Sequence, residues 1–168
     1  MHPQHNTRPD YGWIYQGEDF EMPANPARQR VNINGALNAH QVTDVVVVEA
    51  ERINAQSCIE LWKKQHRKHP GKVIFNICDN APYYHSKIIR EWLVDHPWCQ
   101  IIYLPPYAPN LNLIERLWKY LRKQVTSYCF YEHFEEFRRA ILDFFKNIKA
   151  HKNALESLLT LNFHIVGS

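Results

Sequence analysis

Short runs of apolar and polar positions predict four strands in the first two-thirds of the chain. Residues 30–37 alternate polar and apolar side chains, which is typical of a strand with one face in water. Residues 43–51 contain four consecutive valines and predict a more buried strand, joined to the first by a hairpin through residues 38–41. Two further apolar runs predict strands: a buried one over residues 72–78, after a Pro-Gly break, and another short one over residues 99–104, before two prolines.

Helical spacing and capping residues predict helices between and after these strands. Residues 54–69 begin with an Asn cap and end at Pro-Gly, and residues 86–95 begin with a Ser cap. A third helix is predicted over residues 113–125, and a fourth over about residues 134–149, with a short helix after it. The apolar face of the fourth helix consists of Phe134, Phe137, Ile141, Leu142 and Phe145.

The order of these elements predicts an α/β fold with a sheet of mixed direction. The first two strands form an antiparallel hairpin, whereas strand, helix and strand over residues 72–104 form a βαβ unit with parallel pairing. Helices are expected to cover the faces of the sheet. A length of 168 residues fits one domain. We divide this domain into a core at residues 1–132 and a C-terminal helical part at residues 133–168.

Composition and charge exclude several classes of protein. A hydrophobic share of 45% and a charged share of 22% are typical of a globular chain and exclude wholesale disorder. The longest apolar stretch, residues 45–48, is too short to span a membrane, and the N-terminus lacks the pattern of a signal peptide. The formal charge of +3 permits a polyanionic partner without requiring one.

The four cysteines, Cys58, Cys78, Cys99 and Cys129, are far apart in the sequence and never form a Cys-x-x-Cys pair. This spacing excludes a zinc finger or a redox motif. It predicts reduced thiols in a cytoplasmic protein.

Two carboxylates lie where α/β sheets place ligand sites. Asp79 ends the strand over residues 72–78, and open α/β sheets bind ligands beyond the carboxyl ends of their strands. Glu115 lies in the first turn of the predicted third helix and borders its apolar stripe, so docking of that helix aims its carboxylate toward the same edge. Taken singly, each carboxylate is a weak signal. A Glu in the first turn of a helix, for example, also has a structural explanation, because it complements the helix dipole. Together they predict a site for Mg²⁺, which prefers oxygen ligands, and for phosphoryl transfer assisted by two ions.

Polar and basic residues adjoin the two carboxylates. Asn80 and His85 follow Asp79 in the strand-to-helix loop, and we predict that they orient substrate rather than bind metal, because Mg²⁺ prefers oxygen to imidazole. A purely structural role for His85 at the helix start is the alternative. The Glu115 helix also carries four basic residues suited to a phosphate backbone, with a solvated face as the alternative: Arg116, Lys119, Arg122 and Lys123.

Two motifs closely resemble the catalytic domain of mariner-like transposases, in particular their bacterial insertion-sequence branch. Residues 78–81 read Cys-Asp-Asn-Ala, with His85 following. Residues 104–119 read Leu-Pro-Pro-Tyr-Ala-Pro-Asn-Leu-Asn-Leu-Ile-Glu-Arg-Leu-Trp-Lys. The resemblance extends from residue 2, through residues 30–35, to the predicted fourth helix.

This resemblance implies an RNase H-like fold and Mg²⁺ or Mn²⁺, as two ions, held by an Asp-Asp-Glu triad. It also implies nicking of DNA at transposon ends and joining of the 3′ ends to a target, by a homodimer in a synaptic complex. Asp79 matches the second triad residue and Glu115 the third, and Asn112 joins Asn80 and His85 as a substrate-orienting residue. The implied location is the cytoplasm, on the nucleoid when the protein is bound to DNA.

The first Asp of the triad has no match in this chain. In the family it lies on a central strand immediately before the segment that begins here at His2. Asp10 and Asp19 fall in a polar loop region, and Asp44 begins a different strand. We therefore expect the C-terminal part of a transposase, nearly inactive alone, for which an upstream polypeptide supplies the first Asp and a helix-turn-helix region. The alternatives are a non-catalytic DNA-binding or oligomerising remnant and a generic RNase H-like nuclease, which the block at residues 104–119 disfavours.

Overall fold

In the computed structural model, the described residues are 1–5, 16, 17, 21, 23, 29–105, 112–127 and 129–161. The elements in chain order are β1 (Ile33–Asn38), β2 (Gln41–Glu49), α1 (Ala55–Lys68), β3 (Ile74–Cys78), the 3₁₀ helix η1 (Pro82–His85), α2 (Lys87–Val94), β4 (Cys99–Tyr103), α3 (Leu113–Leu121), the π-helix η3 (Arg122–Thr126), α4 (Phe134–Lys146), the 3₁₀ helix η4 (Ile148–His151) and α5 (Lys152–Leu158).

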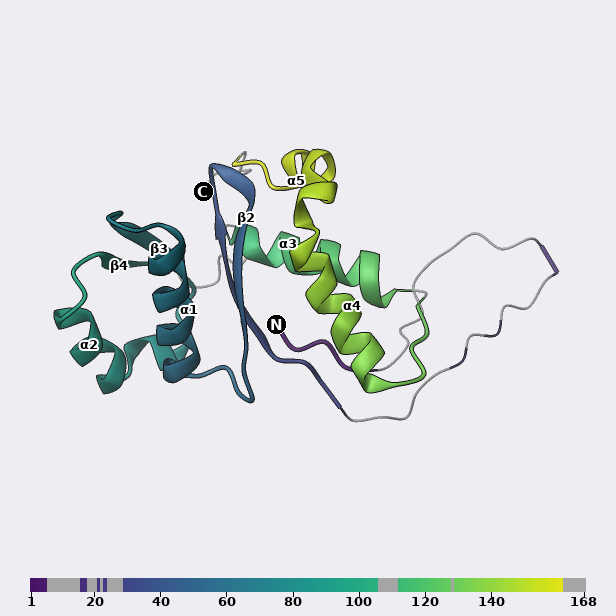
Figure 1. Ribbon diagram of the computed structural model, residues 1–168, viewed down its shortest axis with the longest axis horizontal. Helices are drawn as coiled ribbons and strands as arrows, with labels where there is room; N and C mark the ends of the chain where they lie inside the picture. Colours follow the sequence, from purple (N-terminus) through teal and green to yellow (C-terminus); the bar gives the residue numbers. More distant parts are fainter. Residues whose placement is uncertain are drawn as a thin grey trace.

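Four strands form two separate two-stranded sheets within the described residues. β1 and β2 are antiparallel, with Ala36 opposite Val46, and β3 and β4 are parallel, with Asn76 opposite Ile101. The β1–β2 hairpin runs through the middle of the molecule, with α1, β3, β4 and α2 on one side and α3, α4 and α5 on the other (Figure 1). Both predicted pairings are confirmed, but they do not join into one continuous sheet.

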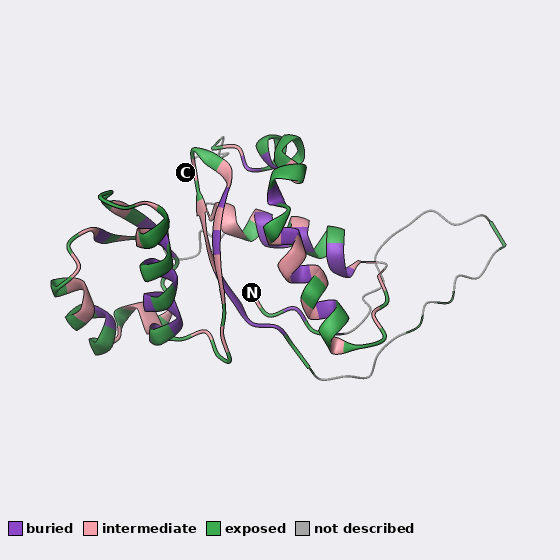
Figure 2. Ribbon diagram, in the orientation of Figure 1, coloured by how far each residue is buried: buried purple, intermediate pink, exposed green. Residues whose placement is uncertain are grey.

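Helix α1 contacts both sheets. It begins at a capping box in which the Asn54 side chain accepts a hydrogen bond from the Ser57 N–H, while the Ser57 hydroxyl accepts one from the Asn54 N–H. Its apolar side packs into a cluster with α2 and β4 that consists of Ala55, Cys58, Ile59, Trp62, Ile89 and Cys99. On the hairpin side, the Asn34 amide donates to the Cys58 Sγ. Figure 2 shows buried residues along the face of α1 that lies toward the hairpin.

The larger core lies on the opposite face of the hairpin, under α3, α4 and α5. Its fully buried side chains include Ile33 of β1, Leu117 and Leu121 of α3, Ile141 of α4 and Leu155 of α5. Leu117 and Leu121 lie four residues apart on one face of α3, as the apolar stripe of the sequence predicts. Burial of these aliphatic groups fixes α3 against β1, and therefore fixes the first turn of α3 as well.

The first five residues extend the hairpin sheet on the free side of β1. The Met1 amino group donates to the Ile33 carbonyl at 2.9 Å, and the Ile33 N–H donates to the Met1 carbonyl at 3.0 Å. Further along, the Val31 N–H donates to the Pro3 carbonyl. Backbone groups alternate along a strand, so the N–H and C=O groups of Gly35 and Leu37 point to the same side as those of Ile33. Within the described residues, no strand pairs with β1 beyond Ile33 on that side.

The β3–β4 sheet has the same kind of open edge. The Ile74 N–H donates to the Trp98 carbonyl and the Leu104 N–H donates to the Cys78 carbonyl, so these β3 groups point toward β4. The N–H and C=O groups of Phe75 and Ile77 therefore point away from β4, where no described strand pairs with them. Within the part of the chain that the structure describes, each sheet thus has an edge strand with outward backbone groups that no other strand pairs.

The predicted burial of β3 is wrong. One face of its sheet is exposed to solvent, with Phe75 65% exposed and Ile77 56% exposed. The neighbouring Ile102 of β4 lies opposite Ile77 and is also exposed. Helices α1 and α2 cover the other face, where Asn76, Cys78 and Cys99 are buried. A five-residue apolar run does not distinguish a strand covered on one face from one covered on both.

The helix boundaries agree with the capping signals. Asn54 caps α1 and Ser86 caps α2 by accepting from the Ile89 N–H at 3.4 Å, both as predicted. The third predicted helix is split into α3 and the π-helix η3, and the fourth ends at Lys146, before η4 and α5. Phe144, absent from the predicted apolar face, is buried, while Leu142 is half-buried.

Gly35 of β1 lies directly under the indole of Trp118. A methyl group on Gly35 would lie 2.6 Å from Cη2 and 3.0 Å from Cζ2 of Trp118. We expect Gly35→Ala to lower the free energy of unfolding by about 1–3 kcal/mol, because overpacking forces the indole or the strand to move. Chemical denaturation measures this loss. Trp118→Phe removes the colliding ring, so adding Gly35→Ala to Trp118→Phe is expected to cost much less; an equal cost in both backgrounds would contradict the contact.

Candidate functional site

Asp79 directly follows β3, and local hydrogen bonds fix its loop. Its Oδ1 accepts from the Ala81 N–H at 3.2 Å, which closes a small turn around an exposed carboxylate. The Asn80 amide donates to the Leu104 carbonyl at 2.7 Å, and the Leu104 N–H donates to the Cys78 carbonyl at 2.8 Å. The end of β4 therefore holds the loop that carries Asp79.

Glu115 lies in the first turn of α3, as predicted, and is exposed. The helix begins after Asn112, whose carbonyl accepts from the Glu115 N–H at 3.1 Å and whose side chain makes no capping hydrogen bond. A carboxylate at this end of a helix is favoured by the helix dipole. Because Leu117 and Trp118 are buried against the hairpin, the direction of α3, and with it the position of Glu115, is fixed by packing.

The pKa of the Met1 amino group is influenced by both carboxylates. Burial lowers this pKa, the charge of Glu115 raises it, Arg122 lowers it, and Asp79 raises it. A cavity of about 130 Å³ adjoins Met1 and is lined by Met1, His2, Pro3, Gln4, Glu115, Trp118, Arg122 and Thr126. Glu115 therefore lines this cavity, whereas Asp79 does not.

The contribution of Met1–Gln4 to the cavity could not be found from the sequence pattern. These residues show neither apolar periodicity nor a capping signal, and their place comes from the backbone ladder with residues 29–33. Arg122 reaches the same cavity as Glu115 because they lie seven residues apart, about two helical turns, on one side of α3 and η3. Sequence analysis named Arg122 for its charge but did not place it in this cavity.

The other predicted site residues lie around the Asp79 loop and along α3. His85 ends η1, is exposed, and stacks on the ring of Tyr103 with ring centroids 4.5 Å apart. Arg116 donates through Nη1 to the Thr160 carbonyl at 3.1 Å, so this residue ties α3 to the segment after α5. The exposed basic residues of α3 and η3 are Lys119, Arg122 and Lys123.

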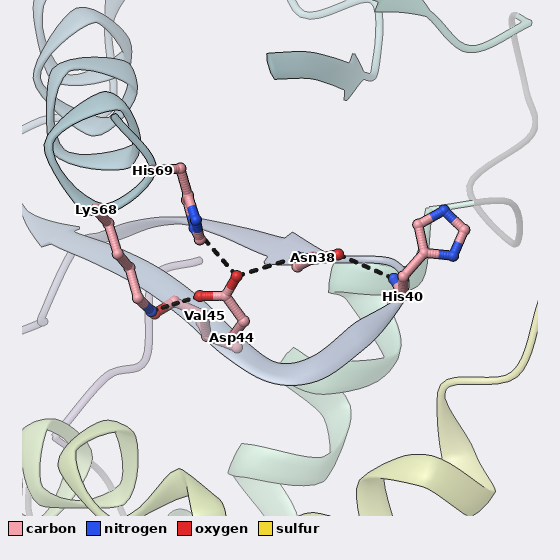
Figure 3. A network of polar contacts seen from close by, with 6 residues as sticks. All are labelled: Asn38, His40, Asp44, Val45, Lys68 and His69. Atoms are coloured by element: carbon pink, nitrogen blue, oxygen red, sulfur yellow. Dashed lines mark hydrogen bonds and ion pairs between the residues drawn. The ribbon is translucent and has the colours of Figure 1, made fainter. Parts of the chain in front are cut away.

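Asp44 has a structural role away from the candidate site, in agreement with its exclusion on sequence. It is a buried residue of β2 and forms an ion pair with Lys68 of α1. The Asn38 amide donates to its Oδ2 at 3.1 Å, and the His69 Nε2 lies 3.1 Å from the same oxygen (Figure 3). This network fastens the end of α1 to the hairpin. Asp10 and Asp19 lie outside the described residues.

The available oxygen donors suit a hard divalent cation. Asp79 and Glu115 are exposed carboxylates, and carboxylate oxygens are the ligands that Mg²⁺ and Mn²⁺ prefer. Among the described residues, no group of three or more His, Cys, Asp or Glu side chains is placed to hold a metal ion. The fit therefore rests on two carboxylates.

The cysteines do not contribute to this site. All four are free cysteines in this structure, and that they are reduced in the cell stays a prediction. Burial raises the pKa of Cys78 and that of Cys99 to about 12, so neither is a thiolate at neutral pH. None of the helices in the described part of the chain has the length and apolar character needed to cross a membrane.

Comparison with known proteins identifies the family. A family profile described as DDE superfamily endonuclease matches residues 1–138. The chain belongs to the DDE endonuclease superfamily. An insertion element IS630 protein of 39 kDa from Shigella sonnei is 34% identical over 116 residues, which cover 68% of this chain and 33% of that protein. This similarity agrees with the resemblance of the sequence motifs to the bacterial insertion-sequence branch.

Solved structures of Mos1 transposase share the fold. The Mos1 strand transfer complex aligns with a TM-score of 0.65 at 15% identity, over 95% of this chain and 49% of the Mos1 chain. The isolated catalytic domain of Mos1 mariner transposase aligns with a TM-score of 0.57 at 17% identity, over 78% of this chain and 70% of that domain. The predicted RNase H-like α/β fold is confirmed. The chain spans about a third of the IS630 protein and about half of the full Mos1 chain.

The Asp44 network predicts a pH dependence of stability. Burial alone would raise the pKa of Asp44, but hydrogen bonds from Lys68 and Asn38 and the charges of Lys68 and His69 lower it overall. A carboxylate whose folded pKa is lowered stabilises the fold above its unfolded pKa of about 4, and this stabilisation is lost as pH falls through the folded value. Asp44→Asn is expected to cost about 1–3 kcal/mol at pH 7 and to remove this part of the acid sensitivity.

Thermal unfolding measured between about pH 2 and pH 7 tests this expectation. Asp143→Asn is the matched control, because Asp143 pairs with Lys146 on the surface and is 43% exposed. Equal stability losses for the two variants at pH 7, or an unchanged acid transition in Asp44→Asn, would contradict the role of Asp44.

Proposed function

We propose that this chain is the catalytic part of a DDE transposase, which cuts DNA at transposon ends and joins these ends to target DNA by metal-assisted phosphoryl transfer. The observation that carries the proposal is the place of the two exposed carboxylates, Asp79 directly after β3 and Glu115 in the first turn of α3. The family match over residues 1–138 and the motif at residues 104–119 support it. The similar Mos1 structures are described as strand transfer, pre-cleavage and paired-end complexes.

Asp79 and Glu115 would hold two Mg²⁺ or Mn²⁺ ions. Related Mos1 paired-end complexes are described with Mn and with Mg, which supports this choice of metals. When bound, such ions activate the attacking oxygen and stabilise the leaving oxygen of a phosphoryl transfer. The protein itself orients these two carboxylates. The Ala81 N–H holds Oδ1 of Asp79, which orients the carboxylate, and the packing of α3 orients Glu115.

Positive charges near the carboxylates would bind the DNA backbone. Arg122 lines the cavity beside Glu115, where a guanidinium can form two parallel hydrogen bonds with a phosphate. Lys119 and Lys123 lie exposed on the same helical segment and would contact neighbouring phosphates, with the side chain of Arg116 contributing its charge. Asn80, His85 and Asn112 would orient the substrate around the metal site without binding metal themselves.

The partners follow from the same reaction. Joining two transposon ends to one target requires two active sites close together, so we infer a homodimer that holds both ends. An upstream polypeptide would supply the first Asp of the triad, on a strand that lies next to β1, and a helix-turn-helix region that reads the end sequence. The site of action would be the nucleoid within the cytoplasm.

A second candidate function is DNA binding or oligomerisation without catalysis. It is favoured by one observation: among the described residues, no group of three or more His, Cys, Asp or Glu side chains is placed to hold a metal ion. The two functions differ in one measurable property, since a DNA-binding remnant would bind DNA without cutting it.

Removal of either carboxylate is expected to abolish metal-dependent nicking. We expect Asp79→Asn and Glu115→Gln each to lower the nicking rate of a chain extended upstream by its first triad strand by about 10³-fold or more, because positioning of the ions dominates this chemistry. The readout is Mn²⁺-dependent conversion of supercoiled plasmid to the nicked form. Glu60→Gln, an exposed carboxylate in α1, is the control and should keep full activity. Equal activity of Glu115→Gln and Glu60→Gln would reject the site.

The 168-residue chain alone is expected to be nearly inactive. Two Mg²⁺ ions carry four positive charges, and two carboxylates with one phosphate leave much of that charge uncompensated. Extension by an upstream strand that carries an Asp should raise the nicking rate by several orders of magnitude, and the same strand with Ala in place of that Asp should not. Robust cleavage by the chain without extension would show that it holds a complete set of ligands.

A further inference from the structure

We propose that Tyr103 is a positioning residue, which holds the imidazole of His85 beside Asp79 so that its ring nitrogens contact a DNA phosphate. This inference rests on the proposed function, because it concerns DNA at the Asp79 site. Sequence analysis identified His85 but not Tyr103, which is 18 residues further along the chain and appeared there only as part of a strand.

Strand pairing brings Tyr103 to the Asp79 loop. Tyr103 is the last residue of β4 and lies opposite Cys78, the residue immediately before Asp79. Its ring stacks on that of His85, with centroids 4.5 Å apart and planes inclined by 25°. Its hydroxyl donates to the Tyr84 carbonyl at 3.3 Å, directly before His85. Tyr103 therefore contacts His85 through its ring and the preceding residue through its hydroxyl.

The backbone on each side of His85 is also fixed. The Ser86 N–H donates to the Tyr83 carbonyl at 3.3 Å, and the Ser86 hydroxyl accepts from the Ile89 N–H to cap α2. On the β4 side, the Leu104 carbonyl accepts from the Asn80 amide, one residue after Tyr103. One short piece of β4 thus holds both the loop of Asp79 and the ring of His85.

The stack of His85 on Tyr103 differs from the stack of His96 on Trp92, in which the histidine also has a structural hydrogen-bond partner. His96 stacks on Trp92 at 3.9 Å and its Nδ1 bonds the Trp92 carbonyl at 2.7 Å, inside a half-buried aromatic cluster. His85 is exposed, and its ring nitrogens make no hydrogen bond within the described part of the chain. Tyr103 itself is 39% exposed. An exposed aromatic pair contributes little to stability, so the geometry indicates orientation of His85 rather than support of the fold.

A phosphate is the group that this arrangement would recognise. Imidazole N–H groups are hydrogen-bond donors, and phosphate oxygens accept most of the hydrogen bonds that proteins make to DNA. Stacking on Tyr103 removes the rotational freedom of the ring in advance, which lowers the entropy lost on binding. A ring without this stack would have to be ordered by the DNA itself.

Fluorescence anisotropy with a labelled random-sequence duplex of about 30 base pairs, at low salt and without divalent metal, tests the proposal. We expect His85→Ala and Tyr103→Leu each to weaken binding about three- to tenfold, which corresponds to loss of a hydrogen bond to a charged group. Tyr103→Phe keeps the stack and should bind within about twofold of the unchanged chain. The matched control is Phe130→Leu, a similarly exposed aromatic residue in another part of the fold, which should also leave binding unchanged.

Two further measurements separate positioning from a structural effect. In the His85→Ala background, Tyr103→Leu should cause no additional loss of affinity. In the NMR spectrum, the ring protons of His85 should show an upfield ring-current shift that Tyr103→Phe retains and Tyr103→Leu removes. Any of three results would overturn the proposal. Tyr103→Leu binds DNA as tightly as the unchanged chain, or Tyr103→Leu weakens binding further in the His85→Ala background. The third is that the unchanged chain binds DNA no more tightly than the double variant. Because these measurements need no metal, they can fail while nicking still depends on Asp79 and Glu115, and the reverse also holds.

Discussion

The position of Asp79 relative to Glu115 depends on the packing of α1 between the two sheets. Asp79 is carried by β3, whose sheet is covered by α1 and α2, whereas Glu115 is carried by α3, which is packed on β1. Helix α1 joins these two parts, because its Cys58 side lies in the β3–β4 cluster and accepts a hydrogen bond from Asn34 of β1. Any change that loosens α1 therefore changes the distance between the two carboxylates without touching either of them.

Each sheet has an open edge among the described residues, one on β1 beyond Ile33 and one on β3. Unpaired backbone groups favour the addition of a strand, since each N–H and C=O gains a partner. The edge of β1 would be the place for the strand that the proposed upstream polypeptide supplies.

The sequence predicted the elements well because most of their signals are local. The caps at Asn54 and Ser86, the βαβ unit and the placement of Asp79 and Glu115 all follow from residues close together in the chain. Features created by contacts between distant segments were missed. The stack of Tyr103 on His85 depends on the register of β4 against β3, and the exposure of Phe75 and Ile77 depends on what covers a sheet. The spacing of apolar residues shows which side of a segment is apolar. It does not show which other segment packs against that side.

Two lysines of α1 close the outer edge of the hairpin sheet. Lys64 donates to the Val47 carbonyl at 2.9 Å and Lys68 to the Val45 carbonyl at 3.2 Å, so ammonium groups occupy acceptors that another strand would use. Charged groups at an edge strand oppose edge-to-edge aggregation, which a run of four valines such as that of β2 favours. Neutralisation of these two lysines, for example by acetylation, would expose a valine-rich edge to self-association.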